Sequence, residues 1–372
     1  MQQTNNANIN SADHTKQKRH AQLHDWLASV ITENEYQVES LPGDASFRCY
    51  HRVYIHYDDS CDLAHATKVY IVMDAPPEKE SVVEFVKVAE LMADYINVPN
   101  IIAKDMDAGF LMLQDFGTTE FAHLLVDATT EQIDGYYQQA LQTLNQLQQI
   151  DVDTARTQAQ TPDYDSALLN QEMDLFSEWF LPYIGVELGE EAKLWQAFKQ
   201  QVIQQVLAQP QVVVHRDYHS RNLMLDKEDH SRLGVIDFQD AVIGAYSYDL
   251  VSLLRDAYVH WNEQKITQWI NNFWQMLTAA NKPTQDAFYH DVTVMGVQRH
   301  LKVLGIFVRL ANRDGKTRYL ADIPKVMDDM LFEIKWLKTH ANGELQLLAE
   351  AFTDWIELVV VPAYRKKFIK AN

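Results

Sequence analysis

The stretch VHRDYHSRN (residues 214–222), followed by VIDFQ (residues 235–239), carries the strongest signal in this sequence. It fits the spacing H-R-D-x-x-x-x-N, with Asp217 as the aspartate and Asn222 as the asparagine, and Asp237 follows after an apolar run. Phosphoryl transfer uses such a set, because one carboxylate accepts the proton of the attacking hydroxyl while an amide and a second carboxylate hold Mg²⁺. The pattern therefore predicts Asp217 as the catalytic base and Asn222 and Asp237 as metal ligands.

Two other interpretations of these residues are open. In the first, Asp217 only caps a turn and Asp237 only ends a strand. The second is the metal site of a hydrolase, made of His215, Asp217, His219 and Asp237. His-x-Asp-x-His is a plausible ligand spacing for such a site. Phosphoryl transfer accounts for Asn222 as well, so we favour it.

Around this stretch the sequence is mainly helical, with a few short β-type runs. The β-type runs lie at 212–214, 223–225 and 233–236. Helical periodicity extends over 119–150, 165–181, 190–208, 246–280, 284–312 and 323–372. We therefore predict a large, mainly helical unit over residues 118–372, with the catalytic loop on a small β-rich island.

The chain before residue 118 has a different pattern. Strands are expected at 47–57, 68–73, 101–105 and 110–114, and helices at 20–31 and 78–96. Residues 1–20 contain little that is apolar and are predicted to form a disordered tail. The prediction for the whole chain is an α+β fold, with a small unit of sheet plus helix over residues 21–117.

Composition excludes several classes of protein. The 372 residues include 32 basic and 52 acidic side chains, a net charge of −20, which disfavours nucleic acid and anionic membranes as partners. No apolar run approaches the roughly 18 residues of a spanning helix, and the polar N-terminus lacks the apolar core of a signal peptide. The two cysteines fit a reducing compartment better than a disulfide scaffold. We therefore expect a cytoplasmic protein.

The sequence resembles the aminoglycoside phosphotransferase family, which has a bilobal protein-kinase-like fold. The resemblance rests on the catalytic-loop pattern and on four further strings, at 41–48, 73–80, 248–256 and 298–307. These strings are most similar to one branch, the bacterial anomeric kinases for N-acetylmuramic acid and N-acetylglucosamine. The resemblance implies an ATP- and Mg²⁺-dependent kinase of cell-wall sugar recycling. It would phosphorylate the anomeric hydroxyl of a small amino sugar to give the sugar 1-phosphate.

The spacing after Asp237 favours a small acceptor. Asp249 lies only 12 positions after Asp237, and no A-P-E motif lies between them. A protein kinase needs a longer activation segment there to bind a polypeptide. Asp249 resembles the aspartate at a helix start that braces the catalytic loop in this fold, and we expect it to be structural.

The resemblance assigns nucleotide binding to residues 21–117, where phosphate-binding motifs are weak. There is neither a G-x-G-x-x-G nor a P-loop lysine motif. A turn at residues 43–46 is the candidate phosphate loop, with Gly43 allowing a tight backbone and Ser46 donating a hydrogen bond. Gln114 and Phe116 lie where the hinge of the family presents backbone groups to adenine.

The lysine expected on the strand at 68–73 is missing, because Met73 or Asp74 stands near its place. Another cation must then neutralise the phosphates. Arg48, Arg52 and Lys68 are the candidates. We favour Arg48, which leaves the proposed phosphate loop.

The acceptor site has four candidate residues. Glu172 lies on the apolar face of a predicted helix, where a carboxylate is costly unless it is paired or faces a polar ligand. Arg299 and Lys302 lie one helical turn apart and could meet a lactyl carboxylate. Asp256, after the brace, is a further candidate. For each, a purely structural role, as a satisfied buried acid or part of a solvated face, is an alternative.

Two alternative functions stay open at this point. One is a kinase of the same fold for an aminoglycoside, choline or another amino alcohol. The other, of a different class, is a non-catalytic nucleotide-binding module, which the missing strand lysine would suit. Intact Asp217, Asn222 and Asp237 argue against that module.

Overall fold

The computed structural model describes residues 3–32, 35–42, 47–56, 67–278 and 282–369, with side chains from residue 17 onward. The predicted phosphate-loop residues Gly43 and Ser46 lie outside the described residues. The chain forms two compact units. The first consists of Met1–Glu90 and Val98–Gly117, and the second of Leu91–Asn97 and Thr118–Asn372.

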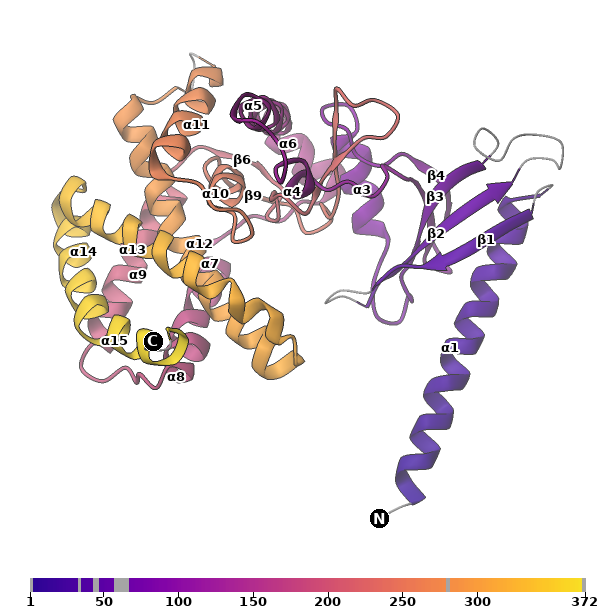
Figure 1. Cartoon of the computed structure of the whole chain (residues 1–372), viewed down its shortest axis with the longest axis horizontal. Coiled ribbons are helices and arrows are strands. Elements are labelled where there is room, and N and C mark those ends of the chain that lie inside the picture. Colours follow the sequence, from indigo (N-terminus) through magenta and orange to yellow (C-terminus); the bar gives the residue numbers. More distant parts are fainter. Residues whose placement is uncertain (1–2, 33–34, 43–46, 57–66, 279–281, 370–372) are drawn as a thin grey trace. The chain divides into compact units, whose positions relative to one another are not determined.

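The first unit contains an antiparallel five-stranded sheet in the order β1-β2-β3-β5-β4 (Figure 1). Its strands are β1 (Glu35–Ser40), β2 (Cys49–His56), β3 (Thr67–Asp74), β4 (Ile101–Asp105) and β5 (Phe110–Gln114). The four strands predicted from the sequence are confirmed. β1 was not predicted, because its sequence EYQVES is mostly polar and gains its place by pairing with β2.

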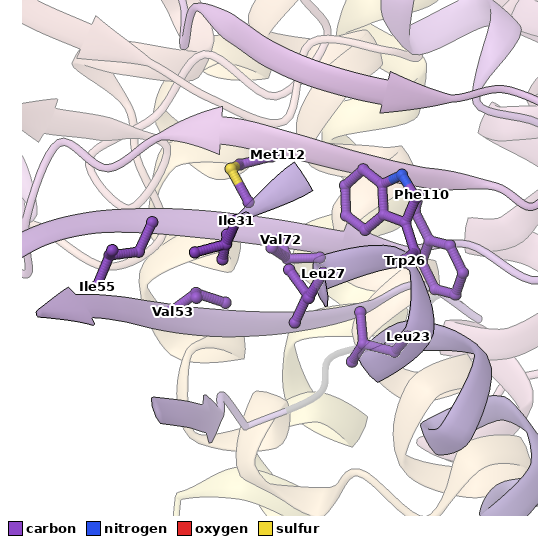
Figure 2. Close-up of a cluster of buried hydrophobic side chains, with 9 residues drawn as sticks. All are labelled: Leu23, Trp26, Leu27, Ile31, Val53, Ile55, Val72, Phe110 and Met112. Carbon is purple, nitrogen blue, oxygen red and sulfur yellow. The ribbon is translucent and has the colours of Figure 1, made fainter. Parts of the chain in front are cut away.

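Helix α1 (Gln3–Val30) covers the sheet with the apolar face that the periodicity predicts. In the core cluster of Figure 2, Leu23, Trp26 and Leu27 from its C-terminal part, and Ile31 directly after it, pack against side chains of β2, β3 and β5. Trp26 stacks on Phe110 with ring centroids 5.3 Å apart. Residues 3–20, expected to be a disordered tail, are helical in the structure. Once the packed turns have nucleated a helix, it can extend toward its N-terminus, because each further residue that is ordered adds one backbone hydrogen bond.

Helix α3 (Val83–Met92) is shorter than the predicted helix over 78–96. Pro76 and Pro77 begin a turn in which Pro76 O accepts hydrogen bonds from the amides of Lys79 and Glu80. The helix therefore begins only after this turn, and Glu80 lies outside it.

The second unit is mainly helical, and the predicted mixed and helical halves of the α+β fold class are confirmed. Its longer helices are α5 (Thr130–Leu147), α7 (Ser166–Leu175), α9 (Ala192–Leu207), α10 (Tyr248–Leu254), α11 (Glu263–Met276), α12 (Gln285–Asp314), α13 (Ile323–His340), α14 (Gly343–Trp355) and α15 (Val361–Phe368). Two antiparallel pairs form the β-island: β6 (Gln211–Val214) with β9 (Val242–Ala245), and β7 (Leu223–Leu225) with β8 (Leu233–Val235). β9 is an addition to the predicted runs.

Helix α12 is the longest regular element of this unit, and its position against α7 matters for the site. Gly305 makes the close approach possible, because a Cβ there would lie 2.3 Å from the Leu175 backbone. Real Cβ atoms do not come so near to a backbone, so only glycine fits. The contact places Lys302 of α12 beside Glu172 of α7, with 2.9 Å between Nζ and Oε1.

Candidate active site

The catalytic loop begins where β6 ends, and one carboxylate holds its backbone. The amides of His215 and Arg216 donate to Oδ2 and Oδ1 of Asp249, at 2.7 and 3.1 Å. Asp249 lies in the first turn of α10 and is fully buried. Burial raises its pKa to about 7, against the hydrogen bonds from the loop. Its predicted role as a structural brace is confirmed.

Arg216 occupies the left-handed region with a φ of 73°. This conformation costs a non-glycine residue about 1–3 kcal/mol and persists where the surroundings fix it. Here they do so at three points. The amide binds Asp249, the side chain reaches Oε1 of Glu172 at 2.6 Å, and the carbonyl accepts from Nη1 of Arg299 at 3.4 Å.

His215 supports the loop from the interior. Its Nε2 donates to the carbonyl of Ile236 at 3.0 Å, and its Nδ1 accepts from the amide of Asp217 at 3.2 Å. This pattern assigns the proton of the neutral ring to Nε2. Burial lowers the pKa of His215 to about 4. With both nitrogens engaged, His215 has no lone pair for a metal, and no group of three metal-ligating side chains occurs among the described residues. These contacts do not support a hydrolase metal site at His215.

Asp217 is only partly buried and has an excess of positive charge around it. Desolvation raises its pKa, but His219, Lys302 and Arg299 outweigh this and hold it below its ordinary value. The carboxylate is therefore ionised at neutral pH. It has the charge that a proton acceptor for a hydroxyl requires.

The two predicted metal ligands lie next to each other. Nδ2 of Asn222 donates to the Asp217 carbonyl at 2.9 Å and approaches Oδ2 of Asp237 at 3.4 Å. The pairing of β7 with β8 brings them together, since the amide of Ile236 also donates to the Asn222 carbonyl at 3.0 Å. Asp237 is exposed and has a φ of 65°. Desolvation of its carboxylate nevertheless raises its pKa. An amide oxygen beside a carboxylate is a donor set that suits Mg²⁺, which takes few protein ligands and keeps water or phosphate oxygens as the rest.

Glu172 is a buried acid that protein donors already satisfy. Its carboxylate pairs with Arg216 at 2.6 Å and Lys302 at 2.9 Å, and it accepts a short hydrogen bond from the Tyr164 hydroxyl. Gln298 adds a longer contact of 3.4 Å. Burial raises its pKa, but the two cations reverse the sign and lower it. In the sequence, Glu172 stood out as an acid on the apolar face of a helix. In the structure it lies at the centre of a cluster of polar side chains.

The other acceptor candidates lie close to the loop. Oδ2 of Asp256 accepts from the amide of Ser220 at 2.9 Å, and Oδ1 accepts from the amide of Tyr258 at the same distance. Arg299 and Lys302 share the hydroxyl of Tyr248, at 3.1 and 2.9 Å. Sequence reasoning missed Tyr248, although the string at 248–256 that carried the resemblance begins with it.

In the first unit, Arg48 is held by Glu80. Nε of Arg48 lies 2.8 Å from Oε2 of Glu80, whose Oε1 accepts from the amide of Phe47 at 3.2 Å. Glu80 therefore fixes the chain directly after the candidate phosphate loop. It too was missed as a single residue, although it closes the quoted string at 73–80.

Asp74, near the place of the missing lysine, binds a cation from another element. Arg19 of α1 pairs with it at 2.6 Å and lies 3.9 Å from the ring centroid of Phe110. This pair was not predicted, since no local pattern links residues so far apart. The strand position thus carries the opposite charge to the one expected and is neutralised inside the unit.

The segment 114–117, predicted as the hinge, is held by side-chain contacts, and its central residues Asp115 and Phe116 are buried. Asp115 pairs with Arg52 at 3.2 Å and accepts from the amide of Gly117 at 2.9 Å. Phe116 is buried, and Oε1 of Gln114 accepts from Nδ2 of Asn100 at 2.9 Å. Arg52 and Arg48 thus each pair with an acid of the first unit, Arg52 with Asp115 and Arg48 with Glu80.

A surface pocket of about 700 Å³ lies elsewhere in the second unit. It is lined by Asp286, Ala287, Tyr289, His290, Asp291, Trp336, His340 and Asn342. None of the predicted site residues lines it, so we do not place the chemistry there. Where the structure describes the chain, every helix is too short or too polar to span a bilayer.

Comparison with protein families gives one match, which covers most of the chain. The model of the phosphotransferase enzyme family matches residues 37–284. An N-acetylmuramate/N-acetylglucosamine kinase of Pseudomonas putida is 40% identical over 292 residues, 76% of this chain and 79% of the relative. A kinase of the same name from Neisseria meningitidis serogroup B is 38% identical over 319 residues, 84% of this chain and 90% of the relative.

Solved structures with the same fold are more distant in sequence. The GDP complex of aminoglycoside 2'-phosphotransferase-IIIa has a TM-score of 0.57 at 16% identity, and covers 83% of this chain and 98% of its own. A choline kinase from Streptococcus pneumoniae has a TM-score of 0.54 at 12% identity, with 84% and 98% coverage. At this identity the likeness concerns the fold, and it confirms the predicted kinase-like fold class.

Proposed function

Because the chain belongs to the phosphotransferase enzyme family, we propose that it transfers the γ-phosphoryl group of ATP to the anomeric hydroxyl of N-acetylmuramic acid or N-acetylglucosamine. The product is the sugar 1-phosphate. Relatives at 38–40% identity that are named kinases for these two sugars support the acceptor. The observation that carries the proposal is the ionised Asp217, directly beside the paired Asn222 and Asp237.

Asp217 has two tasks in this reaction. It accepts a hydrogen bond from the anomeric hydroxyl and so orients the oxygen for attack. As that oxygen bonds to the γ-phosphorus, the bond from phosphorus to the bridging oxygen breaks, ADP leaves, and the hydroxyl proton passes to the Asp217 carboxylate. The nearby cations keep the carboxylate ionised beforehand.

Asn222 and Asp237 would hold Mg²⁺, which neutralises phosphate charge when bound. Their oxygens fit the ion, and the carbonyl of Asp217 accepts from the amide nitrogen of Asn222. The metal pair and the base are thereby tied to one short loop. This connection keeps the distance between the base and the metal pair fixed.

On the nucleotide side, Arg48 would neutralise the phosphates in place of the missing lysine. Its pairing with Glu80 parallels the lysine–glutamate ion pair that protein kinases require. Gly43 and Ser46 are proposed for the phosphate loop that precedes it. The backbone near Gln114 and Phe116 is proposed to bind adenine.

On the acceptor side, the positive charge around Asp217 favours a neutral or anionic sugar over a cationic aminoglycoside or choline. We propose that Arg299 and Lys302 face the sugar. Glu172 holds Arg216 and Lys302 in position, and Asp256 holds the loop at Ser220.

The test is a screen of ATP consumption against amino sugars, aminoglycosides and choline, with phosphorus NMR on the product. The expected result is turnover with N-acetylmuramic acid and N-acetylglucosamine and a phosphate bonded to C1. Turnover with only the aminoglycosides or choline, or a phosphate on another hydroxyl, would contradict the proposal. Nucleotide binding without turnover on any acceptor would favour a non-catalytic module.

A further inference from the structure

The cations close to Asp217 differ in whether a carboxylate binds them directly. Three cations lie close to the catalytic loop: Arg216, Lys302 and Arg299. Glu172 pairs with the first two, at 2.6 and 2.9 Å. Arg299 takes no part in that arrangement, and no described carboxylate forms an ion pair with it.

Arg299 is nevertheless buried, with 8% of its surface exposed. Its two hydrogen bonds go to uncharged oxygens, the Tyr248 hydroxyl at 3.1 Å and the Arg216 carbonyl at 3.4 Å. A buried charge is costly unless an opposite charge compensates it. The carboxylates of Asp217, Asp256 and Asp249 act on it electrostatically, but none of them forms an ion pair with it. Among the described residues, the site thus holds a buried guanidinium that has no direct ion-pair partner.

The unused part of Arg299 has a defined geometry. Both hydrogen bonds use Nη1, so Nε and Nη2 keep their donors, and neither belongs to the fully buried atoms that lack a partner. The side of a guanidinium that carries Nε and Nη2 presents two parallel donors, which match the two oxygens of a carboxylate. Lys302 offers no such side, because its Nζ already binds Glu172 and the Tyr248 hydroxyl at 2.9 Å each.

We propose that Arg299 binds the lactyl carboxylate of N-acetylmuramic acid and thereby sets the preference of this site for that sugar. The inference rests on the proposed function. N-acetylglucosamine has the same ring and anomeric hydroxyl but lacks the lactyl group, so it offers no carboxylate to Nε and Nη2 of Arg299. The Tyr248 hydroxyl and the Arg216 carbonyl fix the guanidinium before the sugar arrives, which reduces the entropy lost on binding.

The experiment compares three acceptors: N-acetylmuramic acid, its lactyl carboxamide and N-acetylglucosamine. For the parent, kcat/KM should be highest for the acid. In Arg299→Gln, the preference for the acid over the other two should fall at least about tenfold, the low end for a hydrogen bond to a charged group. Arg299→Lys should keep part of the preference, because it retains the charge but not the paired donors.

Arg313 provides a matched control, since it lies on the same helix and pairs with Asp314 at the surface. Arg313→Gln removes the same charge and should leave the preference unchanged. Turnover of N-acetylglucosamine by each variant shows that it is folded. The comparison of acid with carboxamide on the parent needs no variant at all.

Three outcomes contradict the inference in different ways. If Arg299→Gln slows all three acceptors by the same factor, Arg299 acts only on the loop. If the parent does not distinguish the acid from its carboxamide, the carboxylate is not recognised. If the parent phosphorylates none of the acceptors, the proposed function itself fails, and the inference fails with it.

Discussion

The catalytic loop of the second unit and the residues of the first unit proposed for nucleotide binding are held in place by different kinds of contact. In the loop, buried carboxylates hold successive backbone amides, as Asp249 does for His215 and Arg216. In the first unit, arginines and acids from separate elements form ion pairs, such as Arg48 with Glu80 and Arg19 with Asp74. The loop fits a motif, whereas the first unit departs from the expected one.

The difference follows from what each region must supply. Proton transfer and metal binding need particular side-chain atoms, so the residue types and spacings are fixed. Phosphate neutralisation needs only a cation at the right place, and adenine recognition needs backbone groups. Several residues can supply either, so the first unit is freer to vary.

The largest effect is expected from removing one of the two proposed metal ligands. Asp237→Ala should lose the gain in nucleotide affinity that Mg²⁺ provides, since it removes one of the two proposed ligands of the ion that neutralises the phosphates. Calorimetry with and without Mg²⁺ measures it. A variant that binds Mg·ATP as tightly as the parent would make Asp237 merely the end of a strand.

The next effect separates the base from the metal. Asp217→Asn should reduce kcat by more than about a hundredfold, the low end for removal of a general base. Nucleotide affinity should change little, because the metal pair stays intact. A reduction of only about threefold or less would be far smaller than this and would show that Asp217 is not the base.

A third test concerns stability and is specific to the buried side of the loop. The pKa of His215 falls from 6.5 to about 4 on folding. Between these values the unfolded chain binds a proton that the native state does not, so the free energy of unfolding falls as the pH falls. From pH 7 to pH 5 the loss should be about 2 kcal/mol.

Denaturant unfolding of the parent and of His215→Gln at several pH values measures this effect. The variant should be less stable at pH 7, because two hydrogen bonds change, but it should lose less on acidification. Parallel stability curves for the two proteins would show that His215 does not carry the pH dependence.

The smallest effect is expected in the first unit, from removing the proposed phosphate-binding cation Arg48. Arg48→Met should raise the KM for ATP or lower kcat about tenfold, or 1.4 kcal/mol. Glu80→Gln should act in the same direction, because Glu80 positions Arg48. Lys104→Met is the control, since its pair with Glu90 is exposed and worth little. A defect in Lys68→Met alone would move the phosphate cation to that strand.

Local patterns were sufficient for much of this protein. The motif around Asp217 predicted that Asn222 and Asp237 belong to one site, and the two side chains lie next to each other beside the pair β7 and β8. Apolar periodicity predicted the face of α1 that covers the sheet. The polar strand β1 and the short β9 were missed, since both owe their form to their partner strands rather than to their own residues.

Long-range charge pairs could not be predicted in the same way. An acid on an apolar helix face marked Glu172, but the sequence left open whether a sugar or a protein cation satisfies it. Only the approach of α12 to α7 at Gly305 brings Lys302 to it. Likewise, Asp74 and Arg19 are far apart in the chain, and the docking of α1 brings them together.

The left-handed backbone at Arg216 lets the side chains on either side of it, His215 and Asp217, face different surroundings. In an extended strand, side chains two residues apart point to the same face. The kink ends that alternation, so His215 is fully buried while Asp217 keeps contact with solvent. A directed-evolution library for new acceptors can therefore keep 215–217 constant and draw its diversity from α12. Arg299 should be kept as well, because its hydrogen bond to the Arg216 carbonyl is one of the three contacts that hold the kink.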